Sequence, residues 1–188
     1  MKKIYAALLM LLPSLVCAQI SKGYYTMFPD DKFVGSYYKP QYAYAKVGDT
    51  ECISLRSCSP NAFHKFDGNS RMLLRFDDGM MFTLPIIMQD NSPLVLENYE
   101  NTHSTNYNTF TNFYVTHSCF KSDADFIQKI KDFKSYIIKI RVVYAGENVI
   151  DYDITKKNQK KITGGFRRSM IVTNTLGYEE KTPNDEDF

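Results

Sequence analysis

A β-hairpin between residues 72 and 84 is the feature that most constrains how this chain can fold. Apolar residues occupy every second position over 72–76 and again over 80–84, and the turn dipeptide Asp78-Gly79 lies between the two stretches. A period of two is typical of a strand with one buried face, and Asp-Gly favours a tight hairpin turn. The sequence therefore predicts two antiparallel strands here.

The rest of the pattern predicts an α+β fold, with a mostly antiparallel or mixed β-sheet of about six to seven strands and two helices in the C-terminal half. A helix is expected from a cap at Ser122 to about Lys134, and a second from about Lys156 to Leu176. Residues 89–108 are rich in Asn, Ser and Thr and predict a loop with at most a short strand at 94–97. Further strands are expected at 42–47, 50–57, 110–117, 136–144 and 149–154.

Residues 1–18 are expected to form a cleavable signal peptide. Lys2-Lys3 precede an uncharged apolar run from Ile4 to Leu12, and Val16-Cys17-Ala18 ends in the small residues typical of a signal peptidase site. The run is too short to cross a bilayer as a helix, which needs about 20 residues. We therefore expect an exported bacterial protein, periplasmic or secreted, with a lipid anchor at Cys17 as the alternative.

Composition divides the remaining chain into three parts. Residues 19–41 are rich in tyrosine and interrupted by prolines, which predicts a loop or extended segment, and residues 42–177 are expected to form a single α+β domain. Residues 178–188 are acidic and predict a disordered tail.

The charge balance bears on partners. Without the two signal lysines the 23 basic residues fall to 21, which equals the 21 acidic residues. This balance does not favour nucleic-acid binding, and no apolar run after the signal is long enough for a transmembrane segment. A cell-envelope partner fits the expected export.

The cysteines after the signal peptide are Cys52, Cys58 and Cys119, without a C-x-x-C pair, which argues against a zinc knuckle or a thioredoxin-type site. If residues 50–57 form a strand, Cys52 and Cys58 lie roughly 20 Å apart, too far for a disulfide. Two alternatives remain: a long-range disulfide bond to Cys119, or three free thiols. The histidines lack ligand spacing, so we expect neither a metal nor a cofactor.

The sequence assigns no catalytic residue, and the candidates for one would be Cys119 and His117. Residues two apart on a strand share a face, and an imidazole can generate the thiolate that acts as a nucleophile. This pair defines the alternative function of a thiol-dependent hydrolase, for which the sequence identifies neither an orienting group nor oxyanion donors. Asp151 and Asp153 are expected on the solvent face of a strand, without a catalytic role.

The predicted helix over 156–176 carries a basic face. At 100° per residue its cations fall within an arc of about 140°, opposite Ile162, Phe166 and Met170. Such a helix can lie against anionic lipid or an acidic partner, or it can pack its apolar residues on a sheet and leave its lysines solvated. The residues of this candidate surface are Lys156, Lys157, Lys160, Lys161, Arg167 and Arg168.

Three motifs carry a resemblance to a known group of proteins. The hairpin Leu74-x-Phe76-x-Asp78-Gly79, the capped helix after it and Ile138-Lys139-Ile140-Arg141-Val142 resemble small exported proteins of unassigned function from Gram-negative anaerobes. The likeness spans roughly residues 45–175 and implies an α+β periplasmic or secreted domain without an assigned activity. We therefore expect a non-catalytic envelope module that binds a partner or ligand through its sheet or its aromatic N-terminal region.

Overall fold

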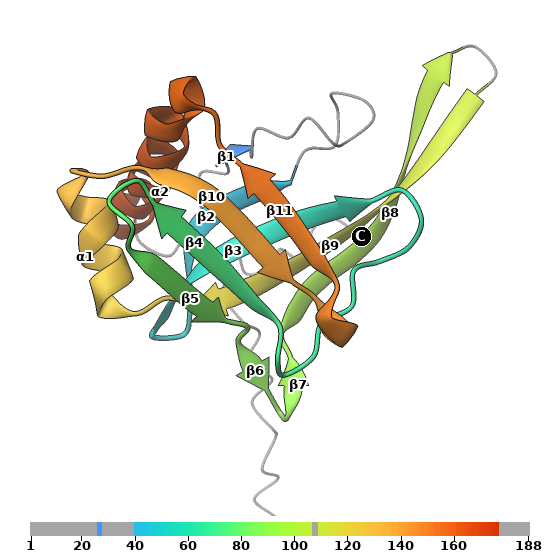
Figure 1. Cartoon of the computed structure of the whole chain (residues 1–188). Coiled ribbons are helices and arrows are strands. Elements are labelled where there is room, and N and C mark those ends of the chain that lie inside the picture. Colours follow the sequence, from blue (N-terminus) through green and yellow to red (C-terminus); the bar gives the residue numbers. More distant parts are fainter. Residues whose placement is uncertain (1–25, 28–39, 107–108, 177–188) are drawn as a thin grey trace, which may run out of the picture.

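The computed structural model describes residues 26–27, 40–106 and 109–176 (Figure 1). The predicted signal peptide, most of the aromatic segment over 19–41 and the acidic tail over 178–188 lie outside these residues.

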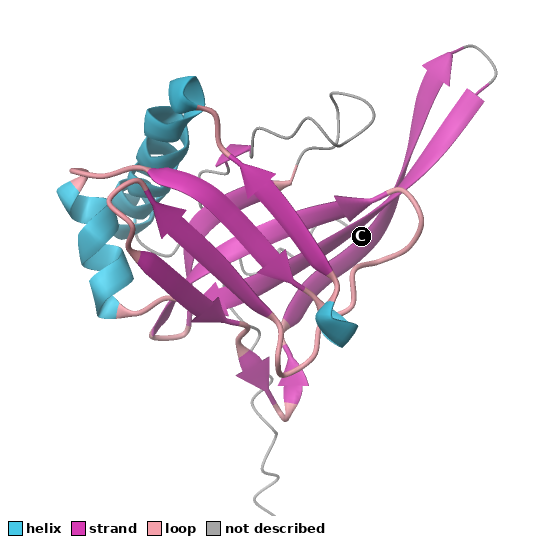
Figure 2. Cartoon of the chain, viewed as in Figure 1, coloured by secondary structure: helices cyan, strands magenta, loops and turns pink. Residues whose placement is uncertain are grey.

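The described chain has an α+β fold built on two antiparallel sheets, which confirms the predicted class (Figure 2). Sheets of five, four and two strands together hold more strands than the six to seven that the sequence predicts. The five-stranded sheet has the order β1 (Thr26–Met27), β2 (Gln41–Val47), β3 (Thr50–Ser59), β9 (Thr109–Lys121), β8 (Val95–Asn106). The four-stranded sheet has the order β11 (Val149–Asp153), β10 (Ile137–Val143), β4 (Arg71–Phe76), β5 (Met81–Pro85). The short strands β6 (Met88–Gln89) and β7 (Ser92–Pro93) pair with each other.

The helices α1 (Ala124–Asp132) and α2 (Lys156–Leu176) gather at one end of the sheets, and a single turn of 3₁₀ helix, η1 (Ala145–Glu147), links β10 to β11 (Figure 1). None of the helices in the described part of the chain combines the length and the apolar character that a membrane-spanning helix requires.

The main core lies where the two sheets and both helices meet. Leu74 of β4 and Leu55 of β3 are fully buried in it, so the predicted alternation of the hairpin places one face of β4 in the core. From α2, Phe166 stacks on Tyr42 of β2 with ring centroids 4.0 Å apart, and the Tyr42 hydroxyl donates to the Ile162 carbonyl at 2.8 Å. These contacts fix which face of α2 is buried.

The predicted β4–β5 hairpin is confirmed. Its register pairs Arg75 with Met81, and Gly79 has φ +88°, a left-handed conformation that favours glycine. The Asp78 carboxylate accepts a bond from the Met80 amide at 3.1 Å, as a turn aspartate often does.

The structure corrects the loop predicted over 89–108. Strand β8 runs through most of that stretch and pairs with β9 from Val95↔Ser118 to Asn106↔Thr109. Asn and Ser have low intrinsic strand preference, but cross-strand pairing decides strand formation more than local preference does. The outer part of this hairpin extends away from the rest of the molecule (Figure 1).

The bounds of α1 differ from the prediction by one or two residues at each end, and those of α2 agree with it. Helix α1 is capped by Asp123, whose carboxylate accepts from the Phe126 amide at 2.6 Å, and not by Ser122 as predicted. It ends at Asp132 because Phe133 adopts a left-handed conformation with φ 53°. Helix α2 has the predicted bounds, and its predicted apolar residues, Ile162, Phe166 and Met170, are buried.

Candidate functional site

The exposed side of α2 and the turn after α1 enclose a groove of about 510 Å³, which we call the basic groove. Five of the six cations predicted for this surface line it, whereas Lys156 is exposed outside it. The lining residues are Phe133, Lys157, Lys160, Lys161, Gly164, Arg167, Arg168 and Ile171.

Two backbone features shape the floor of the basic groove. The left-handed Phe133 ends α1 and places its ring against Gly164, where an added Cβ would lie 3.5 Å from the ring. The guanidinium carbon of Arg167 lies 5.3 Å from the centroid of the same ring, within the range of a cation–π contact. The groove therefore has an aromatic floor with cations along its length.

A second hollow of about 310 Å³ shares Arg167 and Ile171 with the basic groove and adds Lys131 and Asn174 to its lining. No acidic side chain lines either hollow, and within the described residues none of their lysines or arginines forms an ion pair. Among the described residues, no acidic side chain therefore compensates the basic surface over either hollow. Ile171 lies in this surface with 54% of its area exposed.

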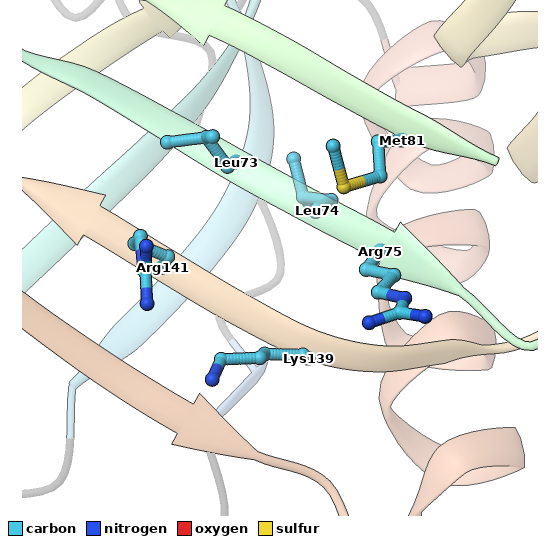
Figure 3. A pocket seen from close by; sticks show the side chains of 6 residues that line it. All are labelled: Leu73, Leu74, Arg75, Met81, Lys139 and Arg141. Carbon is cyan, nitrogen blue, oxygen red and sulfur yellow. The ribbon is translucent and has the colours of Figure 1, made fainter. Parts of the chain in front are cut away.

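The outer face of the four-stranded sheet carries a smaller hollow of about 240 Å³ (Figure 3). Lys139 and Arg141 of β10 lie there beside Arg75 of β4. Asp151 compensates two of these charges, because its carboxylate accepts from Lys139 Nζ at 2.9 Å and from both Arg141 Nε and Nη2, at 2.6 and 2.8 Å. The ion pairs make this hollow the weaker candidate for an anionic ligand.

Replacing Asp151 by asparagine is expected to lower the free energy of unfolding by about 1 kcal/mol at pH 7, the usual upper range for a solvated ion pair. The Arg141 hydrogen bonds hold the pKa of the Asp151 carboxyl well below its ordinary value. Its contribution is therefore present above the unfolded pKa and is lost as the pH falls through the folded pKa. Urea denaturation at pH 7 measures the effect, with the more exposed Asp153→Asn as the control. Equal stability of D151N and wild type would contradict the role assigned to this carboxylate.

The structure places His117 against Ser54. His117 Nε2 lies 2.5 Å from Ser54 Oγ, and its Nδ1 lies 4.0 Å from the Glu97 carboxylate. Burial and the positive charge of Arg56 lower the pKa of His117 to about 4, so the imidazole is neutral at pH 7. Sequence reasoning missed Ser54, because only the register of β3 against β9 brings residues 63 positions apart into contact.

Cys119 lies beside Cys52, and both side chains are fully buried. The register pairs Cys119 with Ser54 and Cys52 with Lys121, so the two cysteines are diagonal neighbours with Cα atoms roughly 8 Å apart by strand geometry. That distance exceeds the disulfide range of about 4.4–6.8 Å. All three described cysteines are accordingly free thiols, and the neighbouring Cys119 together with burial raises the pKa of Cys52.

Neither Ser54 nor Cys119 is exposed, and neither lines one of the three hollows described above. The thiol-dependent hydrolase therefore gains no support from the geometry. Among the described residues, no three His, Cys, Asp or Glu side chains gather as a metal site would require. Comparison of the chain with protein-family models, curated proteins and solved structures found no match.

Proposed function

We propose that this protein is an exported, non-catalytic module of the cell envelope that attaches to an anionic phospholipid surface through the basic groove. The observation that carries the proposal is the gathering of five cations around one groove that no acidic side chain lines within the described ranges. The expected signal peptide supports an envelope location, because it would bring the folded chain to such a surface.

The arrangement of the cations has an energetic cost that a ligand would relieve. Lys157 and Lys161 stand four residues apart on α2, and Lys157 and Lys160 three apart, which are the spacings at which side chains on a helix are neighbours. Like charges at these spacings destabilise a helix by roughly 0.2–0.5 kcal/mol per pair. An anionic surface at the groove would convert this repulsion into attraction.

A lipid surface fits the groove better than an acidic protein because of Ile171. This exposed side chain adjoins Arg167 and Arg168 in the lining, and apolar residues beside cations are typical of helices at a membrane interface. The main apolar face of α2 is occupied by the core, so deep insertion of the helix is excluded. Attraction of about 1 kcal/mol per cation near an anionic lipid surface would supply most of the affinity.

Vesicle binding by the processed chain tests the proposal. The double variant K160Q/K161Q is expected to bind vesicles of phosphatidylglycerol and phosphatidylcholine about 30-fold more weakly than wild type, because two contributions of about 1 kcal/mol are lost. The control K65Q/K121Q removes the same charge from exposed lysines on other elements and is expected to bind like wild type. Added salt should weaken wild-type binding, because it screens exposed charges.

Three outcomes would contradict the proposal. Wild type that fails to bind the anionic vesicles at low salt would exclude a lipid surface. Equal weakening of vesicle binding by the two double variants would show that binding depends on the net charge of the protein and not on the basic groove. Binding to an acidic polypeptide such as polyglutamate, without binding to vesicles, would identify a protein partner instead.

A further inference from the structure

The outer part of the β8–β9 hairpin has no third strand beside it among the described residues. The β3–β9 ladder ends at the pair Ser59↔Tyr114. Beyond it, residues 101–106 and 109–113 pair with each other as a two-stranded ribbon that extends from the body (Figure 1). We call this ribbon the arm. An isolated two-stranded hairpin is marginally stable at best in water, and three or more strands are needed for independent stability.

Strand β8 is the last strand of its sheet in the described part of the chain, so one edge of the arm continues the edge of the whole sheet. The ladder between β8 and β9 runs without a register shift from Glu97↔His117 to Ser104↔Phe110, and bulges lie on both sides of this stretch. A regular ladder on one side of a strand leaves regularly spaced amide and carbonyl groups on the other side. The edge is therefore suited to accept a further strand.

The sequence of the arm lacks the devices that usually protect such an edge. No Asp, Glu, Lys, Arg or Pro occurs between Glu100 and Lys121, whereas Glu97 and Glu100 lie at the base of β8. Charged residues and proline are the common means of blocking strand addition. Within β8 their absence is confined to the part of the strand that leaves the body, which favours this segment as the pairing surface of β8.

We propose that residues 102–104 of β8 pair antiparallel with the same residues of a second copy of this chain. A twofold axis at His103 then joins two arms into one four-stranded sheet, with Thr102 of each copy opposite Ser104 of the other. An antiparallel edge is self-complementary under a twofold rotation, so the free amide and carbonyl groups of each copy meet the carbonyl and amide groups of the other. The uncharged composition favours a second copy, since no like charges meet when identical segments are placed side by side. Glu97 and Glu100 lie toward the body, outside the pairing residues.

Sedimentation equilibrium of the processed chain, with hydrogen exchange of the amides of residues 102–104, tests this inference. Wild type is expected to have the mass of two chains, with these amides protected. The double variant T102K/S104K places two cations on each copy of the pairing strand and is expected to weaken the dimer at least about tenfold, because like charges across strands repel. The matched control T109K/T111K adds the same charge to β9, which faces away from the second copy, and is expected to leave the dimer intact.

Several results would overturn the inference. A single-chain mass at all concentrations with unprotected amides would show that nothing covers the edge. A single-chain mass with protected amides would show that the chain covers its own edge. Species larger than two chains would show that the chains associate without closing into a twofold dimer. Equal weakening of the dimer by both double variants would show that β8 is not the specific pairing strand. The lipid proposal is independent of all these outcomes.

Discussion

Replacing Phe166 by alanine is expected to lower the free energy of unfolding by about 4 kcal/mol, within the usual range for a buried phenylalanine. The side chain has 1% of its area exposed and connects α2 to two other elements. It stacks on Tyr42 of β2 at 4.0 Å and meets the edge of Phe126 of α1 at 6.2 Å. The substitution removes both contacts and leaves a cavity between α2 and the sheet. The surrounding helices and strands can move little to fill this cavity, so its cost remains.

Urea denaturation of F166A and of Ile171→Ala measures this difference within one helix. Ile171 lies five positions further along α2 on the exposed side, so its truncation is expected to change stability by no more than about 0.5 kcal/mol. A similar loss in both variants would mean that α2 is rotated relative to the sheet. The pair of variants therefore also checks the orientation that exposes the basic groove.

The sequence predicted α2 correctly because several independent signals agree over its length. The spacing of Ile162, Phe166 and Met170 follows the helical period, and the cations occupy the opposite arc. Periodicity places side chains around one helix but says nothing of what lies next to it. The floor of the basic groove could not be predicted, because Phe133 reaches Gly164 only through the left-handed end of α1.

The β-sheet was harder to predict where its residues have no strong local preference. Leu74 and Phe76 alternate with polar residues and were assigned correctly, since one face of β4 is buried. The Asn- and Thr-rich β8 has no such pattern, and it forms a strand because β9 is beside it. The contact between Ser54 and His117 depends in the same way on register between strands far apart in sequence, which composition and spacing do not encode.

Acidification from pH 7 to pH 4 is expected to lower the free energy of unfolding by about 3 kcal/mol through His117 alone. Burial and the charge of Arg56 lower its pKa from 6.5 in the unfolded chain to about 4 in the fold. Between these values the unfolded chain binds the proton and the folded chain does not, so stability falls as the pH falls. Below pH 4 both states are protonated, and this loss stops.

The variant H117Q isolates this effect, since glutamine cannot take up the proton. Its stability should change less than that of wild type between pH 7 and pH 4.5, whatever the cost of the substitution at pH 7. H64Q is the matched control, because the partly buried His64 lies on a different segment and its loss leaves the contribution of His117 in place.

The sign of the pH dependence decides between two roles for Glu97. Its carboxylate lies 4.0 Å from His117 Nδ1, and a true ion pair there would raise the pKa of the imidazole instead of lowering it. With a raised pKa, the folded protein would bind the proton more tightly than the unfolded chain, so its stability would increase as the pH falls from 7 through that pKa. The variant H117Q would lack this increase. A wild-type protein more stable at pH 5.5 than at pH 7, with H117Q lacking this increase, would show that the charge of Glu97 outweighs burial. The opposite slope would show that desolvation dominates at this position, as the enclosure of His117 between Ser54 and Arg56 indicates.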